Sequence, residues 1–282
     1  MRLFLYMLIL AVSGLFTWVA VKTMRFACRK WKLERPNFQG RKIPVGFGFI
    51  LTIVTVLICL LSTVLALKSG DSDALSQAVL AFPVTVLIFG VIGLIDDIYG
   101  TREAGGFLGH IGLLRQGKLS TGFMKAVIGG IIALGTGTVM AGYDITGSLV
   151  NALLIALSAN LLNLLDLRPG RAVSCFWVWM IALAAFAKPS DATWFAFAAL
   201  FVPALWLTVQ DRSARIMLGD AGSNVLGAML GMFTACSVGI TGRIVIVVLL
   251  ICIHLYAEKY SISKFIEKNR ILRKVDRMLG VR

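Results

Sequence analysis

Three carboxylate motifs adjoin long apolar runs in this chain. Asp96 and Asp97 end the run VTVLIFGVIGLIDD, Asp166 follows SLVNALLIALSANLLNLL, and Asp220 precedes SNVLGAMLGMF. Ionised carboxylates beside apolar segments are costly unless another group compensates their charge. A helix that ends at Asp96 and Asp97 would add repulsion from its negative dipole end. A divalent cation would remove this conflict, so the pattern predicts a metal site at a membrane face.

The segment after the acid pair supplies cations and leaves two interpretations open. Gly100 is placed to end the preceding helix, and Arg102, Arg115 and Lys118 follow it. A metal ion bound together with a phosphate would use both the acids and these cations. A helix-end acid pair neutralised by Arg102 alone explains the carboxylates equally well.

The second motif, SANLLNLLDLRPGRA, spaces its polar residues for one face of a helix. Asn160, Asn163 and Asp166 recur every third residue, so we expect a polar stripe along the inner end of that helix. Such stripes in membrane helices bond to neighbouring helices or line a cavity. Arg168 and Arg171 place two cations beside Asp166, which favours an anionic substrate.

The third motif, RIMLGDAGSNVLG, places Asp220 in a glycine turn, and Ser223 is positioned to cap the next helix. Backbone N–H groups at a helix start bind phosphate oxygens, and a neighbouring carboxylate can hold the accompanying magnesium. The motif alone is common in ordinary turns. All three motifs on one face of one bundle indicate a binding site.

The composition predicts a polytopic, all-α membrane helix bundle. Of the 282 residues, 58% are hydrophobic and only 15% are charged, which a water-soluble globule would not tolerate. No linker or internal repeat divides the chain, so the expected domains are a membrane domain, 1–257, and a basic amphipathic tail, 258–282. Since one crossing needs about 20 apolar residues, we expect nine transmembrane helices, near residues 3–21, 43–67, 77–95, 123–142, 148–165, 173–187, 194–209, 223–240 and 243–257.

The distribution of basic residues predicts the orientation of the bundle. Among the 28 Lys and Arg residues, all except Arg2, Lys68, Lys188 and Arg243 fall on one side of the nine expected spans. Because Lys and Arg accumulate in cytoplasmic loops, we expect the N-terminus outside and the C-terminus in the cytoplasm. The three carboxylate motifs then share the cytoplasmic face. The net charge of +14 indicates anionic membrane lipid, and no nucleic acid, as the partner.

Further residues carry weaker predictions. The tail from Tyr260 to Arg282 mixes apolar and basic residues as in a helix lying on the membrane, although topology-setting charge explains it too. The basic loop 22–42 could hold a phosphate. His110 is expected at the membrane interface, and His254 is equally compatible with a ligand and with an ordinary helix residue. The five cysteines form no C-x-x-C pair, so neither a disulfide nor a zinc framework is expected.

The motifs, taken in order, resemble those of the polyprenyl-phosphate N-acetylhexosamine-1-phosphate transferase family, which includes phospho-N-acetylmuramoyl-pentapeptide transferase. The resemblance rests on Gly-Leu-Ile-Asp96-Asp97, Asn160-x-x-Asn163-x-x-Asp166 and Gly219-Asp220-Ala221-Gly222-Ser223, with Pro44-x-x-x-Gly48 after the first loop. It implies that a polyprenyl phosphate attacks the β-phosphate of a UDP-N-acetylamino sugar and releases UMP, for envelope synthesis at the plasma membrane. Magnesium is the implied cofactor.

The resemblance also implies roles for individual residues. Asp220 and Asp97 would hold the metal, and Asp96, Asp97 and Asp166 would form the catalytic set. A homodimer is compatible with the sequence. The residues that would contact the substrates are Asn160, Asn163, Arg168, Arg171, Lys42 and His254.

Three departures from the family pattern fall on substrate recognition. Pro169 stands where family members carry a second acid, Gln210 and Asp211 replace an expected asparagine, and a histidine-rich loop is reduced to His254. These changes predict a divergent sugar donor. A non-catalytic relative that binds lipid phosphate or scaffolds envelope enzymes is the alternative. A transporter is a third interpretation, and the lack of broken helices and of an internal repeat opposes it.

Overall fold

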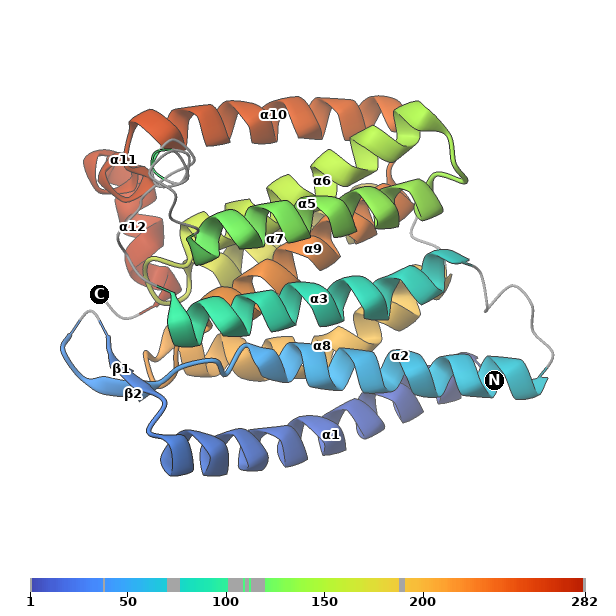
Figure 1. Cartoon of the computed structure of the whole chain (residues 1–282), viewed down its shortest axis with the longest axis horizontal. Helices are drawn as coiled ribbons and strands as arrows, with labels where there is room; N and C mark the ends of the chain where they lie inside the picture. The colour runs from blue at the N-terminus through green and yellow to red at the C-terminus, as the bar shows by residue number, and fades with distance from the viewer. Residues whose placement is uncertain are drawn as a thin grey trace.

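The computed structural model of the chain describes residues 2–37, 39–69, 77–100, 109, 112, 120–187 and 191–280. Within these ranges, nine long helices alternate in direction along the long axis of the molecule, and the hairpin and the tail helices lie together at one end (Figure 1). The long helices are α1 (Arg2–Trp31), α2 (Phe49–Ser69), α3 (Gln77–Tyr99), α5 (Thr121–Met140), α6 (Ile145–Leu165), α7 (Arg171–Phe186), α8 (Asp191–Arg212), α9 (Gly219–Ser237) and α10 (Ile240–Lys259). The remaining elements are α11 (Ile262–Lys268), α12 (Arg270–Leu279), β1 (Glu34–Pro36) and β2 (Lys42–Pro44).

Five of the described helices are long and apolar enough to cross a membrane, namely α1, α3, α5, α6 and α10. The described parts of α2 and α7 add shorter apolar helices. These elements form the helical bundle of a membrane protein, which confirms the predicted all-α class. The count of nine spans and the orientation of the termini remain predictions.

The first loop differs from its expected form. Helix α1 continues to Trp31, and strands β1 and β2 then pair antiparallel, with Glu34 opposite Pro44. Asn37 closes the turn between them, because its side-chain oxygen accepts the backbone N–H groups of Gln39 and Arg41 at 2.9 and 3.0 Å. The basic segment 22–42 is therefore part helix and part hairpin.

The buried centre of the bundle is α9. Every residue from Ala221 to Ala235 is buried, and the helix packs against α6, α3, α7 and α2. Small residues allow this close packing: a Cβ at Gly227 would overlap the Ser158 carbonyl oxygen of α6. Helices in membranes associate through such small residues, because lipid provides no hydrophobic force to drive them together.

The structure confirms one predicted helix boundary and corrects another. Helix α3 ends at Tyr99, and the N–H of Gly100 bonds the Asp96 carbonyl oxygen at 2.7 Å, as expected for a terminating glycine. Helix α9 begins at Gly219, so the prediction that Ser223 caps it was wrong: Ser223 lies inside the helix, fully buried.

The tail is built from two helices. Asn269 separates them and caps α12 through its side-chain oxygen, which accepts the N–H groups of Ile271 and Leu272. Exposed apolar side chains on α12 include Ile271 and Met278. Contact of the tail with anionic lipid remains a prediction.

The close packing of α6 against α9 can be tested with a glycine pair. We expect Gly227→Ala to lower the midpoint of thermal unfolding in detergent, because overpacking costs about 1–3 kcal/mol. Gly130→Ala is the matched control, since a Cβ at Gly130 meets no atom within 4 Å. An unchanged midpoint for Gly227→Ala would contradict the packing.

Candidate active site

Asp97 connects α3 to the start of α9. Its carboxylate oxygens accept the backbone N–H groups of Asp220 and Ala221 at 2.8 and 3.1 Å. The turn requires Gly219, whose φ of +68° is left-handed and where a Cβ would lie 2.6 Å from the Asp97 oxygens. The carboxylate satisfies two N–H groups that have no partner within the helix and faces the positive dipole end. Asp97 therefore caps α9.

Lys125 lies between the other acid of the pair and Asp220. Its Nζ is 3.3 Å from an Asp96 oxygen and forms a second ion pair with Asp220. The Asp96 and Asp220 carboxylates also lie near each other, so their like charges repel unless a cation lies between them. The Lys125, Asp96 and Asp220 side chains are only 18%, 19% and 23% exposed. These groups form a largely buried, acid-rich cluster around one cation.

The sequence analysis did not single out Lys125, because in the sequence it is one of many basic residues on the predicted cytoplasmic side. The structure places it in α5, which begins at Thr121, so its side chain faces the acids from a third helix. One signal could have found it. A single lysine near the start of an apolar helix needs an acidic partner, and the carboxylate motifs were predicted on the same side of the membrane.

The polar stripe of α6 divides between two environments. Asn163 joins the cluster: its Nδ2 lies 3.3 Å from an Asp220 oxygen, and its Oδ1 accepts the Ser223 hydroxyl at 3.3 Å. Asn160 is exposed, because three residues rotate a helix by less than a full turn. Of the two asparagines, Asn163 is the one that orients Asp220.

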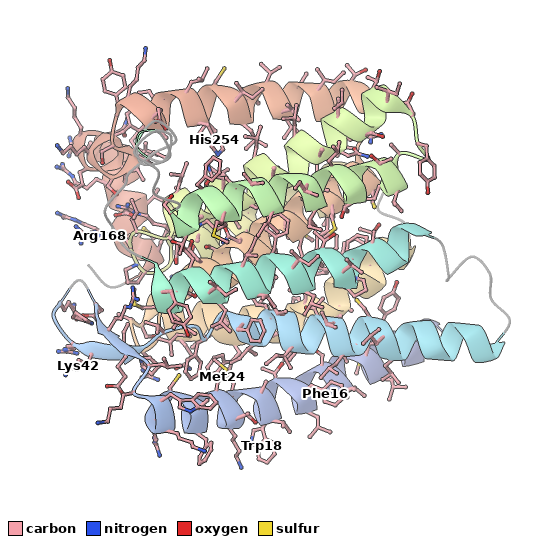
Figure 2. The ribbon with its side chains drawn as sticks, viewed as in Figure 1. Phe16, Trp18, Met24, Lys42, Arg168 and His254 are labelled. Atoms are coloured by element: carbon pink, nitrogen blue, oxygen red, sulfur yellow. The ribbon has the colours of Figure 1, made fainter. Side chains whose placement is uncertain are left out.

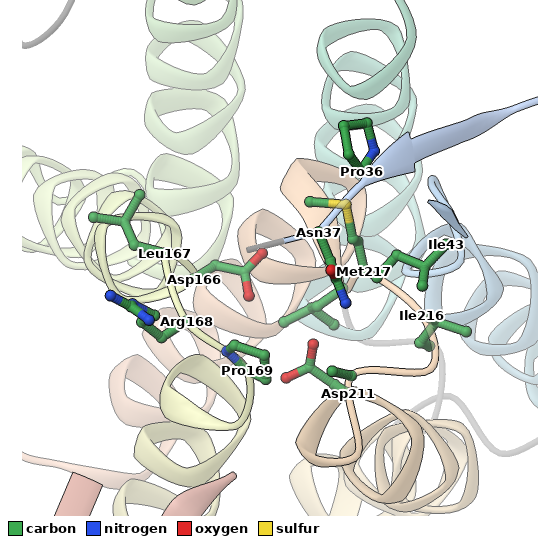
Figure 3. A pocket seen from close by; sticks show the side chains of 12 residues that line it. Pro36, Asn37, Ile43, Asp166, Leu167, Arg168, Pro169, Asp211, Ile216 and Met217 are labelled. Carbon is green, nitrogen blue, oxygen red and sulfur yellow. The ribbon is translucent and has the colours of Figure 1, made fainter. Parts of the chain in front are cut away.

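Asp166 faces a cavity of about 440 Å³ beside the cluster (Figure 3). It bonds the backbone of Gly219, and its pKa lies well above the usual range, first because the surrounding chain excludes water and second because Asp211 and Asp220 lie near. Asp211 is buried and accepts the Gly170 N–H at 2.7 Å. The cavity is lined by Pro36, Asn37, Ile43, Asp166, Leu167, Arg168, Pro169, Asp211, Ala214, Ile216, Met217 and Leu218.

Asp211 lies next to Pro169, the position at which the family pattern expects an acid. Pro169 and Asp211 line the same cavity, and Figure 3 shows the Asp211 carboxylate beside the proline ring. The chain thus supplies an acid from the end of α8 next to the position where the family pattern expects one. Sequence reasoning recorded Asp211 only as a departure, since the two positions are far apart along the chain.

Lys42, Arg168 and His254, which were predicted to contact the substrates, lie apart from one another (Figure 2). Arg168 lines the cavity, 3.9 Å from Glu267. Lys42 is exposed, because strand alternation turns its neighbour Ile43 to the cavity instead. His254 lies on α10, with Nδ1 2.7 Å from the Leu250 carbonyl oxygen of its own helix.

Among the described residues, no hydrogen bond or ion pair joins Lys42 or His254 to the acids. Arg171 is buried and its guanidinium binds Asp276 and Ser263. Substrate contact by these three residues remains a prediction. Arg102, Arg115, Lys118 and His110 lie outside the described residues, so neutralisation of the acid pair by Arg102 is also untested.

The chain matches the model of glycosyl transferase family 4 over residues 79–238. The match covers more than half of the chain and contains Asp96, Asp97, Asp166 and Asp220. The chain belongs to this family, the polyprenyl-phosphate sugar-1-phosphate transferases. It is a membrane transferase that moves a sugar phosphate to a lipid carrier. A comparison with curated proteins gave no match.

The acids of this transferase fit a magnesium ion. Asp96 and Asp220 present oxygens from two helices to one cation, the Lys125 ammonium, and carboxylate oxygens are the ligands that Mg²⁺ prefers. In the part of the chain that the structure describes, no three His, Cys, Asp or Glu side chains form a metal-holding group. Mg²⁺ needs only one or two carboxylates when water and substrate phosphates complete its shell. Asp97 uses both oxygens on α9, so its metal contact remains a prediction.

The cap by Asp97 gives a stability prediction. We expect Asp97→Ala to lower the thermal midpoint, because a lost N-cap costs about 0.5–2 kcal/mol, and Asp97→Asn to lower it less, since one acceptor oxygen remains. Asp144→Ala calibrates the effect, because Asp144 caps the opposite end of the bundle at the start of α6. A midpoint for Asp97→Ala equal to that of the unaltered protein would contradict the cap.

Proposed function

We propose that this transferase moves a sugar 1-phosphate from a UDP-N-acetylamino sugar to a polyprenyl phosphate, such as undecaprenyl phosphate, and releases UMP. The product is a lipid-linked precursor of a cell-envelope glycopolymer, made at the cytoplasmic face of the plasma membrane. One observation carries the proposal: Asp96, Asp97, Asp220 and Lys125 converge at one end of the bundle in a family that transfers sugar phosphates to lipids.

The proposed reaction joins two anions. An oxygen of the lipid phosphate attacks the phosphorus that carries the sugar, and a new P–O bond forms there. The bond from that phosphorus to the bridging oxygen breaks, and UMP leaves with this oxygen. Such a transfer depends on alignment and on charge neutralisation more than on covalent help from the protein. Magnesium bound at the acids would supply positive charge to both phosphates.

The residues of the cluster have distinct parts in this proposal. Asp220 and Asp96 offer oxygens to the metal, and Asn163 holds the Asp220 side chain in orientation. Lys125 keeps the two acids together and adds positive charge where the phosphates meet. The cavity at Asp166 is the candidate donor site, because it adjoins the cluster through Gly219 and offers both acids and apolar walls.

A non-catalytic relative that binds lipid phosphate is the competing proposal. Pro169, in place of an acid, favours it. The position of Asp211 beside Pro169 weakens it, because an acid is still present at the cavity.

The direct test is release of UMP. Purified protein is incubated with undecaprenyl phosphate, Mg²⁺ and a panel of UDP-N-acetylamino sugars. We expect UMP with at least one donor, no UMP after chelation with EDTA, and recovery when Mg²⁺ is restored. If a preparation that still binds Mg²⁺ releases no UMP with any donor, the non-catalytic proposal replaces this one.

Substitutions test the assignment of residues. We expect Asp220→Asn and Lys125→Met to reduce the rate of UMP release by about 100-fold or more, because each removes a charge that faces the reacting phosphates. Asp144→Asn is the matched control: it makes the same chemical change at the opposite end of α6, and asparagine caps helices well. Normal rates in either cluster variant would refute the site.

A further inference from the structure

The C-terminal helix α12 is bonded to the segment that follows Asp166, 105 residues earlier in the chain. The Arg171 guanidinium donates from Nε and Nη2 to the two oxygens of Asp276 at 2.6 and 3.0 Å. The Arg171 and Asp276 side chains are only 4% and 9% exposed. A two-point pair of this kind fixes both the distance and the orientation of the guanidinium.

Backbone contacts reinforce the pair. Gly170 has a φ of +84°, and a Cβ there would overlap the carbonyl oxygen of Leu279 at the end of α12. Arg212, the last residue of α8, donates to the Met278 carbonyl oxygen at 2.8 Å. Arg171 also donates from Nη1 to Ser263 of α11 at 2.7 Å. The tail therefore packs directly against the turn formed by residues 168–171.

The same turn forms a wall of the cavity. Its residues Arg168 and Pro169 line the cavity together with Asp166. Asp211, at the end of α8, also accepts the Gly170 N–H at 2.7 Å. The turn is thus held by contacts with the end of α8 and with α12, and these contacts fix the positions of Arg168 and Pro169 at the cavity.

We propose that α12 positions the donor side of the site, with Arg171 and Asp276 as the positioning pair. Breaking a buried pair leaves an uncompensated charge, which is strongly unfavourable, so the turn has one preferred position while the pair is intact. The inference rests on the proposed function for the identity of the donor. The positioning of the turn rests on the contacts alone.

The experiment compares the full-length protein in detergent with three variants. Asp276→Ala removes the acid, Asp276→Glu restores it on a longer side chain, and Glu267→Ala is the control. Glu267 belongs to the same tail but is 56% exposed and lies 3.9 Å from Arg168, a geometry that contributes little. Backbone hydrogen exchange is measured for peptides covering 166–171, with 222–235 of α9 reporting on folding. KM and kcat are measured for donor and lipid separately.

We expect Asp276→Ala to speed exchange in 166–171 but not in α9. We also expect it to raise the donor KM by roughly 10-fold or more, because small displacements of positioning groups have effects of this size. The KM for polyprenyl phosphate should not change, Asp276→Glu should recover part of the loss, and Glu267→Ala should match the unaltered protein.

Three outcomes would overturn the inference: unchanged exchange in 166–171, faster exchange with an unchanged donor KM, or equal changes in both KM values. If the unaltered protein releases no UMP with any donor, the proposed function fails by itself. The exchange comparison then decides alone whether α12 positions the turn.

Discussion

The bond between the Asp97 carboxylate and the first N–H groups of α9 is the constraint on which the rest of the site depends. Helix α9 is buried from Ala221 to Ala235, and its first N–H groups have no partner within the helix, so another group must satisfy them. An acid from α3 does so, and this places Asp220 beside Asp96. The same hydrogen bonds therefore stabilise the central helix and bring the acids together.

The negative charges of the acids are compensated by different groups. This difference indicates which carboxylates are free to bind a metal or a substrate. The charge of Asp97 is compensated by backbone N–H groups and the dipole of α9. Asp96 and Asp220 share the single ammonium of Lys125, and Asp166 and Asp211 face a cavity with Arg168 at its wall. Among the described residues, the acids of the cluster outnumber its one cation, so an added cation would find carboxylate oxygens that are not yet compensated.

Two departures of this transferase from the motifs of its family, Pro169 and Asp211, meet at the cavity. The pyrrolidine ring of Pro169 restricts the backbone of the turn, and Gly170 lets the turn pass close to the end of α12. Asp211 brings a carboxylate to the same cavity from α8. The chain therefore keeps an acid at the cavity but supplies it from another helix, and its tail contacts the turn that carries Arg168 and Pro169.

The sequence by itself determined the membrane helices, the three carboxylate motifs and their common end, because apolar runs and polar spacing are local properties that survive folding. Only the tertiary structure decided the partners of each charge. Lys125 lies in the acid cluster, Arg171 pairs with Asp276, and Lys42 points away from the cavity. Helix rotation and strand alternation set these side-chain directions. The start of α9 at Gly219 likewise depended on Asp97, an acid that lies far away in sequence and adjacent in space. Packing between distant segments decides these charge pairs, and the spacing of residues along one helix does not identify the partners.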